Sequence, residues 1–446
     1  MKKKVLAALL AGILAAVMLM GCGGAAQSSA APASEEAKSE EAAPASSEEA
    51  APASSEEAAP AEEPVGNDTI KIWVADNIVD FTKEKAEGFM AEHPELGSFE
   101  ILVQAVGEGD AAGNMITDVE AGADIYGFAQ DQISRLVAAG ALEEVAPENI
   151  DAVKAQNDAG AVGAATVGGT LYAYPITSDN GYFLYYDKSV VTDPSSLEKV
   201  LADCEAAGKN FYMEINSGWY QTAFFFATGC KLEYETDDSG NFTKANITYA
   251  TPEGLIALKE MIELNASPAF QNGSSAGQAT DYAALVDGTW DAGAVKEALG
   301  ENYACAKLPS FEGADGKTYQ LSGFGGFKLL GVKPQTDEAK LAACDALAAY
   351  LAGEEVQLAR FDAVGWGPSN LNAQKSDAVQ ADEALSALAE QLAFTIPQGQ
   401  YPGDYWTLAT GLGDDIRQGN LTPDSSDDDL MAALQKFQDT CMSYVG

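Results

Sequence analysis

The sequence predicts an α/β protein of two lobes, preceded by an export leader and an acidic tether. Apolar strand-like runs alternate with amphipathic helical runs over most of the chain. About 380 residues follow the tether, which is too many for one hydrophobic core and natural for two. The residues before position 66 differ in composition from the rest of the chain.

The chain begins with "MKKKVLAALLAGILAAVMLMGC": three lysines, an apolar run from Val5 to Met20, and a Gly-Cys pair. This pattern is typical of a secretion signal, and the apolar run is short for a retained membrane span. "LMGC" resembles a lipobox, although Met20 stands where a small or β-branched residue is usual. We expect a lipoprotein signal peptide at 1–21 with lipid on Cys22. The alternative is an ordinary signal peptide with an incidental cysteine.

Residues 22–65 contain the repeat "APASSEEA", at 43–50 and again at 51–58, without any apolar period. Alanine, proline, serine and glutamate cannot bury enough surface to offset chain entropy, so we expect a disordered tether. Its ten glutamates and one lysine repel one another and favour an extended chain.

The net charge of −43 disfavours some classes of partner. The leader contributes three lysines and the tether nine net negative charges, so −37 remains for the part from Val65 onward. Such a field disfavours nucleic acid and anionic substrates. The simpler interpretation is that acidic residues keep an exported protein soluble.

Cysteine and histidine usage argues against metal, redox and nucleophilic chemistry. Five cysteines follow Cys22 without a Cys-x-x-Cys pair, so we expect one disulfide at most and no metal motif. His93 is the only histidine, which excludes a multi-histidine zinc site, and its place before Pro94 at an expected helix end disfavours a Ser-His-Asp triad. We expect no cofactor.

The first half of the folded part alternates strands and helices. Strands are expected in "TIKIWVAD", "FEILVQAV", "ADIYGFA", "LYAYPI" and "GYFLYYDKS", and helices in "FTKEKAEGFMAEHPE", "AAGNMITDVEAG" and "DQISRLVAAGALEEV". In open α/β sheets, ligands bind where strands end in loops. Polar and aromatic residues at strand ends are therefore the candidates for function.

The second half adds helices with recognisable starts. "SSLEKVLADCEAAG" has a capping-box spacing from Ser195 to Glu198. "TPEGLIALKEMIELN" places Thr251 as the cap and Pro252 at the first helical position. Further helices are expected in "TDEAKLAACDALAAYLAG" and "EEVQLARFDAVG", and in the C-terminal "DDDLMAALQKFQDTCMSYV", which has acids at its positive end.

Trp290 stands among small turn-formers in "LVDGTWDAGAV". Most tryptophans fill cores, and this string alone favours that role. The alternative is a flat stacking surface for a ligand.

The order of several segments resembles the extracellular solute-binding proteins of ABC importers, in the branch that includes maltose-binding protein. The segments are "ADIYGFAQDQISRLVAAGALEEV", "GGTLYAYPITSDNGYFLYYDKSVV", "DGTWDAG", "CAKLPSFEGADGK" and "LAAYLAGEEVQLARFDAVGWGPSN". The resemblance covers Ile70 to Val445. It implies a two-lobe, type II periplasmic-binding-protein-like α/β fold with hinge strands and a ligand cleft. The implied lobes are 66–178 plus 325–375 and 182–320 plus 380–446.

The resemblance also implies a sugar site lined by aromatic rings. The four matching positions fall on Phe128, Trp219, Trp290 and Trp406, and Tyr220 is the alternative to Trp219. Stacking a sugar face on such rings removes apolar area from water.

Polar residues would orient the sugar, because hydroxyls that leave water need hydrogen-bond partners. Asp131 and Asp179 match acidic positions of the pattern, and Asp76 and Asn77 lie in the first strand-end loop. Gln132 stands where maltose binders commonly have arginine, and Ile78 where they have lysine, which puts malto-oligosaccharides in doubt. Each acidic residue could instead be solvated surface.

Two other patterns point elsewhere. Tyr185 and Tyr186 are adjacent, as in ferric-ion binders, but strand alternation should turn one of them into the lobe. "GFGGF" at 323–327 lacks the features of a phosphate loop and indicates a tight backbone crossing near the hinge.

The resulting expectation is a monomeric, non-enzymatic lipoprotein, anchored on the extracytoplasmic face of the cell membrane. It would capture an oligosaccharide, with malto-oligosaccharide first, and deliver it to an ABC permease. The same fold could bind another oligosaccharide, a polyamine or a peptide. A surface glycosidase using Asp131 and Asp179, and a cell-surface scaffold, are the rivals from other classes.

Overall fold

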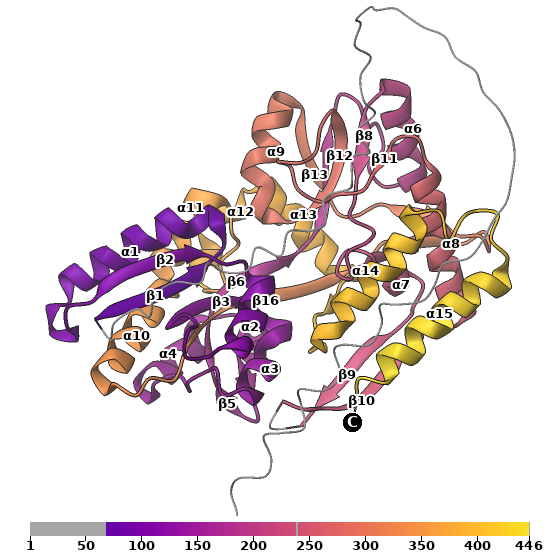
Figure 1. Cartoon of the computed structure of the whole chain (residues 1–446). Coiled ribbons are helices and arrows are strands. Elements are labelled where there is room, and N and C mark those ends of the chain that lie inside the picture. The colour runs from indigo at the N-terminus through magenta and orange to yellow at the C-terminus, as the bar shows by residue number, and fades with distance from the viewer. Residues whose placement is uncertain (1–67, 238–239, 446) are drawn as a thin grey trace, which may run out of the picture. The chain divides into compact units, whose positions relative to one another are not determined.

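The structure is a computed structural model that describes residues 68–237 and 240–445. The expected signal peptide, Cys22 and the tether at 22–65 lie outside the described residues. Within them the chain forms two principal β-sheets, each with its own helices and buried core (Figure 1).

The first sheet has the strand order β17-β16-β3-β1-β2, and β6 also pairs with β16. The strands β1, β2 and β3 are parallel, whereas β16 runs antiparallel to both β3 and β6. The bounds are β1 (Thr69–Val74), β2 (Glu100–Ala105), β3 (Ile125–Ala129), β6 (Ala173–Gly181), β16 (Phe324–Val332) and β17 (Ile396–Pro397).

The helices beside this sheet come from two distant parts of the chain. In Figure 1 the orange α10 lies near the indigo α1, and the two helices are in contact. On α1, Thr82, Ala86 and Met90 are buried at helical spacing, so one stripe faces the core. The bounds are α1 (Val79–Glu92), α2 (Glu108–Thr117), α3 (Ile133–Ala138), α4 (Pro147–Gln156), α5 (Ala159–Ala164), α10 (Glu338–Leu351) and α11 (Glu354–Val364).

The second sheet has the order β11-β8-β12-β7-β13. Tyr185 of β7 is fully buried and Tyr186 is not, which confirms the predicted alternation. The strands are β7 (Phe183–Asp187), β8 (Asn210–Tyr212), β11 (Phe270–Gln271), β12 (Tyr282–Asp287) and β13 (Tyr303–Ala306). Three short antiparallel pairs complete the strands: β4 (Thr166–Val167) with β5 (Thr170–Leu171), β9 (Leu232–Thr236) with β10 (Phe242–Ile247), and β14 (Ser310–Glu312) with β15 (Thr318–Gln320).

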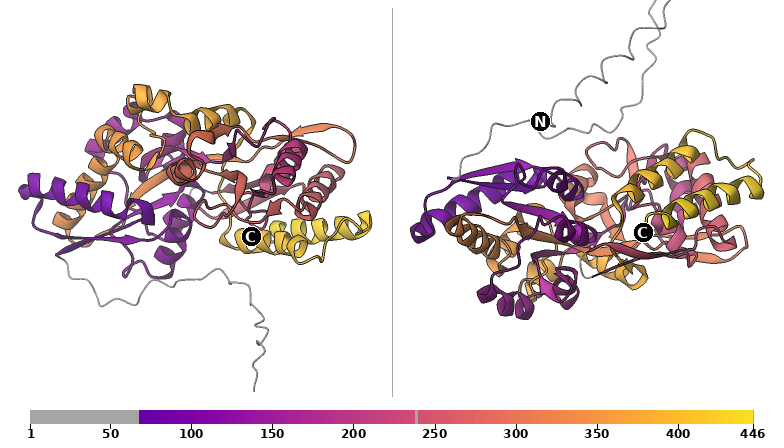
Figure 2. Two further views of the ribbon diagram at one scale, coloured as in Figure 1. Left: turned by 90° about the horizontal axis from the view of Figure 1, so that it is seen from above. Right: turned by 60° about the horizontal axis from the view of Figure 1, so that its bottom comes forward.

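The helices beside the second sheet include the C-terminal pair α14 and α15, drawn in yellow to orange-yellow (Figure 2). These two helices contact each other and α8. The start of α15 confirms the predicted acids, because Asp427, Asp428 and Asp429 occupy its first turn. The bounds are α6 (Leu197–Ala207), α7 (Thr222–Ala227), α8 (Pro252–Ala266), α9 (Ala292–Leu299), α12 (Asp377–Gln380), α13 (Glu383–Gln391), α14 (Gly403–Arg417) and α15 (Asp427–Met442).

Two helix starts test the predicted caps. The Thr251 hydroxyl accepts a hydrogen bond from the backbone N–H of Gly254, with Pro252 first in the helix, as predicted. For α6 the predicted cap is one residue early. The structure places Ser196 at the cap, because its hydroxyl accepts from the Lys199 N–H, whereas Ser195 turns to Asp193.

The chain passes from the first sheet to the second directly, since only Tyr182 separates β6 from β7. There Gly325 pairs with Gly181, and Gly326 with Asn180, in the register of β16 against β6. A Cβ on Gly325 would lie 2.8 Å from the Thr395 hydroxyl, so the backbone approach needs glycine. The "GFGGF" segment therefore forms the tight crossing that the sequence indicates.

Among the described residues, no helix combines the length and apolarity needed to cross a membrane. The five cysteines at 204, 230, 305, 344 and 441 are free thiols. No group of three or more metal-ligating residues gathers within residues 68–237 and 240–445.

Candidate functional site

Three of the four predicted aromatic residues, Trp219, Trp290 and Trp406, are partly buried, and the rings of Trp219 and Trp290 contact each other. Trp290 belongs to the short 3-10 helix η4 (Thr289–Asp291), which follows β12. Its ring centroid lies 5.7 Å from that of Trp219, in the loop before α7. Trp219 also packs edge-on against Tyr220, with centroids 5.1 Å apart. Two strand-end loops thus present adjacent indole rings.

Trp406 joins this group through α14. A Cβ added to Gly218 would lie 3.2 Å from Cε3 of Trp406, so the Trp219 loop approaches α14 closely. The Trp406 ring rests against Tyr405, with centroids 4.9 Å apart, and remains partly exposed. We call Trp219, Tyr220, Trp290 and Trp406 the aromatic cluster.

Phe128 lies elsewhere, which corrects the expectation for this residue. Its side chain is 0% exposed and belongs to the core of the first sheet, 5.6 Å from the Tyr126 ring. In a strand, alternate side chains point to opposite faces, and the phase of β3 turns Phe128 inward. With no exposed face, the ring offers no surface for stacking.

Tyr220 is 5% exposed and acts as a hydrogen-bond donor. Its hydroxyl donates to Oδ1 of Asp287, 3.0 Å away, at the end of β12. Burial, and then the nearby Asp291, raise the pKa of Asp287, which favours its neutral form. Oδ2 of Asp287 accepts no hydrogen bond among the described residues, but the Asp287 carboxyl interacts with the side chain of Asp291.

Asp131 follows β3 in the 3-10 helix η3 (Gln130–Gln132), at the carboxyl edge of the parallel strands. The side chain is 2% exposed, and its Oδ1 has no partner among the described residues. Burial raises the pKa of Asp131 to about 7, although Arg135 opposes the shift. A buried carboxyl of this kind has hydrogen-bonding capacity left for a ligand.

The side chain of Gln132 is already occupied. Its amide donates to the carbonyls of Glu108 and Gly109, at 3.1 and 3.0 Å, and fastens η3 to the start of α2. Its Oε1 accepts from Nη2 of Arg135 at 3.5 Å. The structure therefore gives Gln132 a supporting role rather than a free ligand contact.

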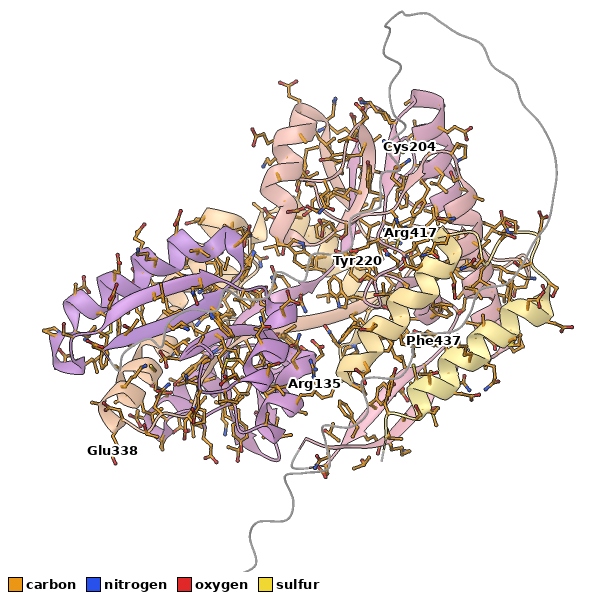
Figure 3. All side chains as sticks on the ribbon, in the orientation of Figure 1. Arg135, Cys204, Tyr220, Glu338, Arg417 and Phe437 are labelled. Atoms are coloured by element: carbon orange, nitrogen blue, oxygen red, sulfur yellow. The ribbon has the colours of Figure 1, made fainter. Side chains whose placement is uncertain are left out.

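Residues before α14 bind the carboxyl edge of the first sheet. Gln400 donates to the carbonyl of Gln130 at 2.8 Å and accepts from the backbone N–H of Ser134 at 3.1 Å. Arg135 on α3 reaches the same segment (Figure 3), since a Cβ on Gly403 would lie 2.6 Å from its Nη1. These contacts bring Asp131 toward the helix that carries Trp406.

Asp179 of β6 is 2% exposed and joins two loops. Its Oδ2 accepts from the Thr289 hydroxyl and from the backbone N–H of Gly367, each at 2.5 Å. These partners are the neighbours of Trp290 and Trp366 in the sequence. Asp179 thus fixes the two tryptophans, while its Oδ1 has no partner among the described residues.

Sequence reasoning missed Lys328 and Trp366. Nζ of Lys328 lies 3.7 Å from the ring centroid of Trp366 and 5.0 Å from that of Trp290. Trp366 stands in "FDAVGWGPSN", a segment interpreted only as a helix followed by a proline loop. A tryptophan between two glycines was the available signal.

Asp76 and Asn77 lie in η1 (Asp76–Ile78), directly after β1, and both are exposed. Because β1 and β3 are parallel, these residues share the edge that carries Asp131. Ile78, which replaces a lysine of the maltose-binder pattern, is buried instead.

Comparison with known proteins identifies the family of the chain. Residues 84–387 match the family described as bacterial extracellular solute-binding protein. The galactooligosaccharide-binding protein of Bacillus subtilis (strain 168) is 26% identical over 331 residues, which span 68% of this chain and 74% of that protein.

Solved structures confirm the expected fold class. One described as "with acarbose" is 28% identical, has a TM-score of 0.73, and covers 85% of this chain and 99% of its own. The maltodextrin binding protein MalE1 from L. casei BL23, solved without ligand, is 23% identical with a TM-score of 0.68, covering 84% and 98%. The chain therefore belongs to the bacterial extracellular solute-binding proteins.

Proposed function

We propose that this protein is the substrate-binding lipoprotein of an ABC sugar importer. It captures an oligosaccharide, with malto-oligosaccharide as the first candidate, and delivers it to a membrane permease. The observation that carries the proposal is the aromatic cluster, in which partly exposed indoles adjoin buried polar atoms with unused hydrogen-bonding capacity. The family membership and the names of the relatives support it.

Sugars suit this combination of groups. The C–H faces of a pyranose lose water when they rest on an indole, while the hydroxyls still need donors and acceptors. Asp131 offers a buried carboxyl oxygen that has no protein partner among the described residues. Asp76 and Asn77 add exposed polar groups at the same edge as Asp131.

In this proposal the two sheets belong to two lobes that close around the ligand. We assign 66–178 plus 325–375 to one lobe and 182–320 plus 380–446 to the other. A ligand that bridges both lobes favours the closed form by its additional contacts. Lipid on Cys22 and the tether at 22–65 would hold the monomer near the permease on the extracytoplasmic face.

Calorimetric titration of Trp290→Ala with a panel of gluco-oligosaccharides tests the proposal. Loss of one stacked ring should weaken binding by roughly 10- to 100-fold, as expected for about 1.5–3 kcal/mol of apolar burial. Tyr350→Ala is the matched control, because Tyr350 is a partly buried aromatic residue that stacks on Phe89 of α1, outside the cluster. Equal affinity of the parent and Trp290→Ala for every bound sugar would remove the stacking role.

The rival functions predict different results, which further measurements distinguish. A glycosidase would release reducing ends during long incubation, whereas a receptor returns its sugar intact. A polyamine would meet the Lys328 ammonium beside Trp290, and like charges repel at this position. A scaffold protein would give no thermal shift with any solute.

A further inference from the structure

Lys328 is a buried cation beside the aromatic cluster. It lies on β16, opposite Ala129 of β3, and is 6% exposed. Its ammonium contacts the rings of Trp290 and Trp366. Within residues 68–237 and 240–445, this ammonium has neither an ion pair nor a hydrogen-bond acceptor.

The surroundings of Lys328 are fixed by other contacts. Oδ2 of Asp179 holds Thr289 and Gly367 together, and these residues adjoin the two tryptophans. The backbone of Lys328 is fixed as well, because its N–H donates to the Thr177 hydroxyl at 3.3 Å. The lysine therefore occupies a defined position at the site rather than a loose surface one.

The missing hydrogen-bond acceptors around Lys328 indicate the chemistry of a ligand group that would suit this position. An ammonium has three donors and no acceptor, so at a largely buried lysine without a protein acceptor these donors depend on water or on a ligand. Two indole faces stabilise the charge through cation–π attraction but accept none of its hydrogen bonds. Nε1 of Trp366 is also a donor that lacks a partner among the described residues. A group that only accepts hydrogen bonds satisfies such donors better than a hydroxyl does.

We propose that Lys328 is a specificity-determining residue that binds the carboxylate of an acidic sugar, such as a uronic acid unit, next to Trp290. This inference rests on the proposed function and narrows its substrate class. An ionised acceptor forms shorter and stronger hydrogen bonds with an ammonium than a hydroxyl does.

The acidic surface of the protein does not prevent this. The net charge of −43 is spread over the whole chain, and salt screens exposed charges beyond about 8 Å at physiological ionic strength. A contact between the carboxylate and a buried ammonium is screened much less. At this position, the attraction between a ligand carboxylate and the nearby Lys328 ammonium therefore outweighs the long-range repulsion of anions by the net negative charge.

The test uses the full chain and pairs of sugars that differ at one carbon. Each pair contains a neutral trisaccharide and its counterpart with one C6 hydroxymethyl oxidised to a carboxylate, in gluco, galacto and manno series. Calorimetry should show that the parent binds one acidic member at least about tenfold more tightly than its neutral counterpart. Lys328→Met should lose this preference, and Lys328→Arg should keep it.

Lys307→Met is the matched control. Lys307 also lies over one aromatic ring, Phe394 at 5.1 Å, but it has its own acceptor in Gln320. This variant should keep the acidic preference, and circular dichroism should show that all three variants are folded. If Lys328→Met does not fold, the acidic preference of the parent and of Lys328→Arg still tests the role of Lys328, because loss of the preference in Lys328→Arg contradicts it.

The outcomes separate the two proposals. If the parent binds neutral sugars at least as tightly as acidic ones, the role of Lys328 is overturned and sugar capture stands. The same holds if Lys328→Met keeps a tenfold acidic preference, or if Lys328→Arg loses it. If no sugar of any series binds, the proposed function fails and this inference fails with it.

Discussion

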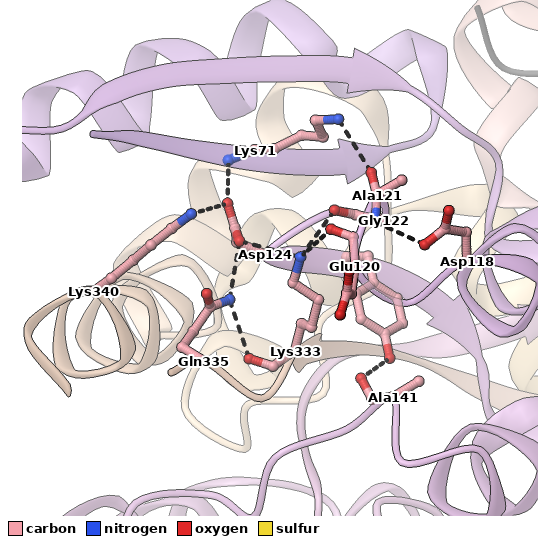
Figure 4. A network of polar contacts seen from close by, with 11 residues as sticks. Lys71, Asp118, Glu120, Ala121, Gly122, Asp124, Ala141, Lys333, Gln335 and Lys340 are labelled. Atoms are coloured by element: carbon pink, nitrogen blue, oxygen red, sulfur yellow. Dashed lines mark hydrogen bonds and ion pairs between the residues drawn. The ribbon is translucent and has the colours of Figure 1, made fainter. Parts of the chain in front are cut away.

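The two ends of strand β3 each carry a buried aspartate, and the two carboxyls have opposite surroundings. Asp124 precedes the strand and is 3% exposed, whereas Asp131 follows it and is 2% exposed. At Asp124 both oxygens are satisfied (Figure 4): Oδ2 accepts from the Lys71 N–H and pairs with Lys340 at 3.0 Å. At Asp131, Oδ1 has no partner among the described residues.

Two lysines, Lys328 on β16 and Lys333 just after this strand, show the same contrast between an unpaired and a paired buried group. Lys333, just past the strand, pairs with Asp124 at 3.6 Å and donates to the carbonyls of Glu120 and Gly122. Lys328, at the other end of the pairing with β3, contacts only aromatic rings through its ammonium, among the described residues. A satisfied buried network stabilises the fold, whereas the unsatisfied groups at the carboxyl edge are the ones that the proposed function assigns to the ligand.

The largest effect should come from breaking the satisfied end. Asp124→Ala leaves the buried ammonium groups of Lys333 and Lys340 without their carboxylate, so the free energy of unfolding should fall by about 3–5 kcal/mol. Urea unfolding followed by circular dichroism measures this. Asp118→Ala, an exposed aspartate of the same region, should cost less than about 1 kcal/mol. A similar small loss at Asp124 would contradict the structural role of the network.

A smaller effect should appear at the unsatisfied end, and it depends on pH. The folded-state pKa of Asp131 is raised to about 7 by burial, while an unfolded aspartate titrates near 3.9. The folded protein therefore holds the extra proton between these values. Protonated Asp131 therefore contributes to the free energy of unfolding. This contribution is fully present below about pH 4 and is lost as the pH rises through 7.

Asp131→Asn should remove this dependence, which we expect to amount to roughly 2–4 kcal/mol in the free energy of unfolding. Urea unfolding at pH 4.5 and pH 8 measures the difference for each protein. Asp404→Asn is the control, because Asp404 is exposed near Arg135 and should leave the pH dependence unchanged. An identical pH profile for the parent and Asp131→Asn would show that the buried carboxyl is not the cause.

Much of the fold is local in origin, and so the sequence predicts it. The alternation of strands and helices, the Thr251 cap and the acids that start α15 depend on residues close together in the chain. Trp290 is different, because the local string alone favours a core role and only the family resemblance makes this residue a ligand-binding candidate.

The errors and omissions come from long-range geometry. In "IYGFA" of β3, four of five residues are buried, so the strand has no polar face from which the direction of Phe128 could be read. Lys328 is a candidate only because its ammonium contacts the rings of Trp290 and Trp366. One of these tryptophans precedes Lys328 in the chain and the other follows it, so only the fold brings the three residues together. Asp179 matched a family position, but its bridge between two loops follows from tertiary contacts alone.

The smallest of the three effects separates two roles of Asp179. One oxygen accepts both hydrogen bonds that hold Thr289 and Gly367, so Asp179→Ala should lower the free energy of unfolding by about 1–3 kcal/mol. Asp179→Asn can keep both bonds with its remaining oxygen and should stay within about 0.5 kcal/mol of the parent.

Sugar affinity then distinguishes positioning from direct contact. If Asp179 only positions Trp290 and Trp366, Asp179→Asn binds sugar as the parent does, and Asp179→Ala binds it several-fold more weakly. If the unpartnered Oδ1 accepts a sugar hydroxyl, Asp179→Asn also loses affinity although its stability is kept, because an amide N–H₂ replaces the acceptor. Calorimetric titration of both variants with sugar distinguishes the two roles. Only a loss of affinity in Asp179→Asn would show that Asp179, like Asp131 in the proposed function, contacts the ligand directly.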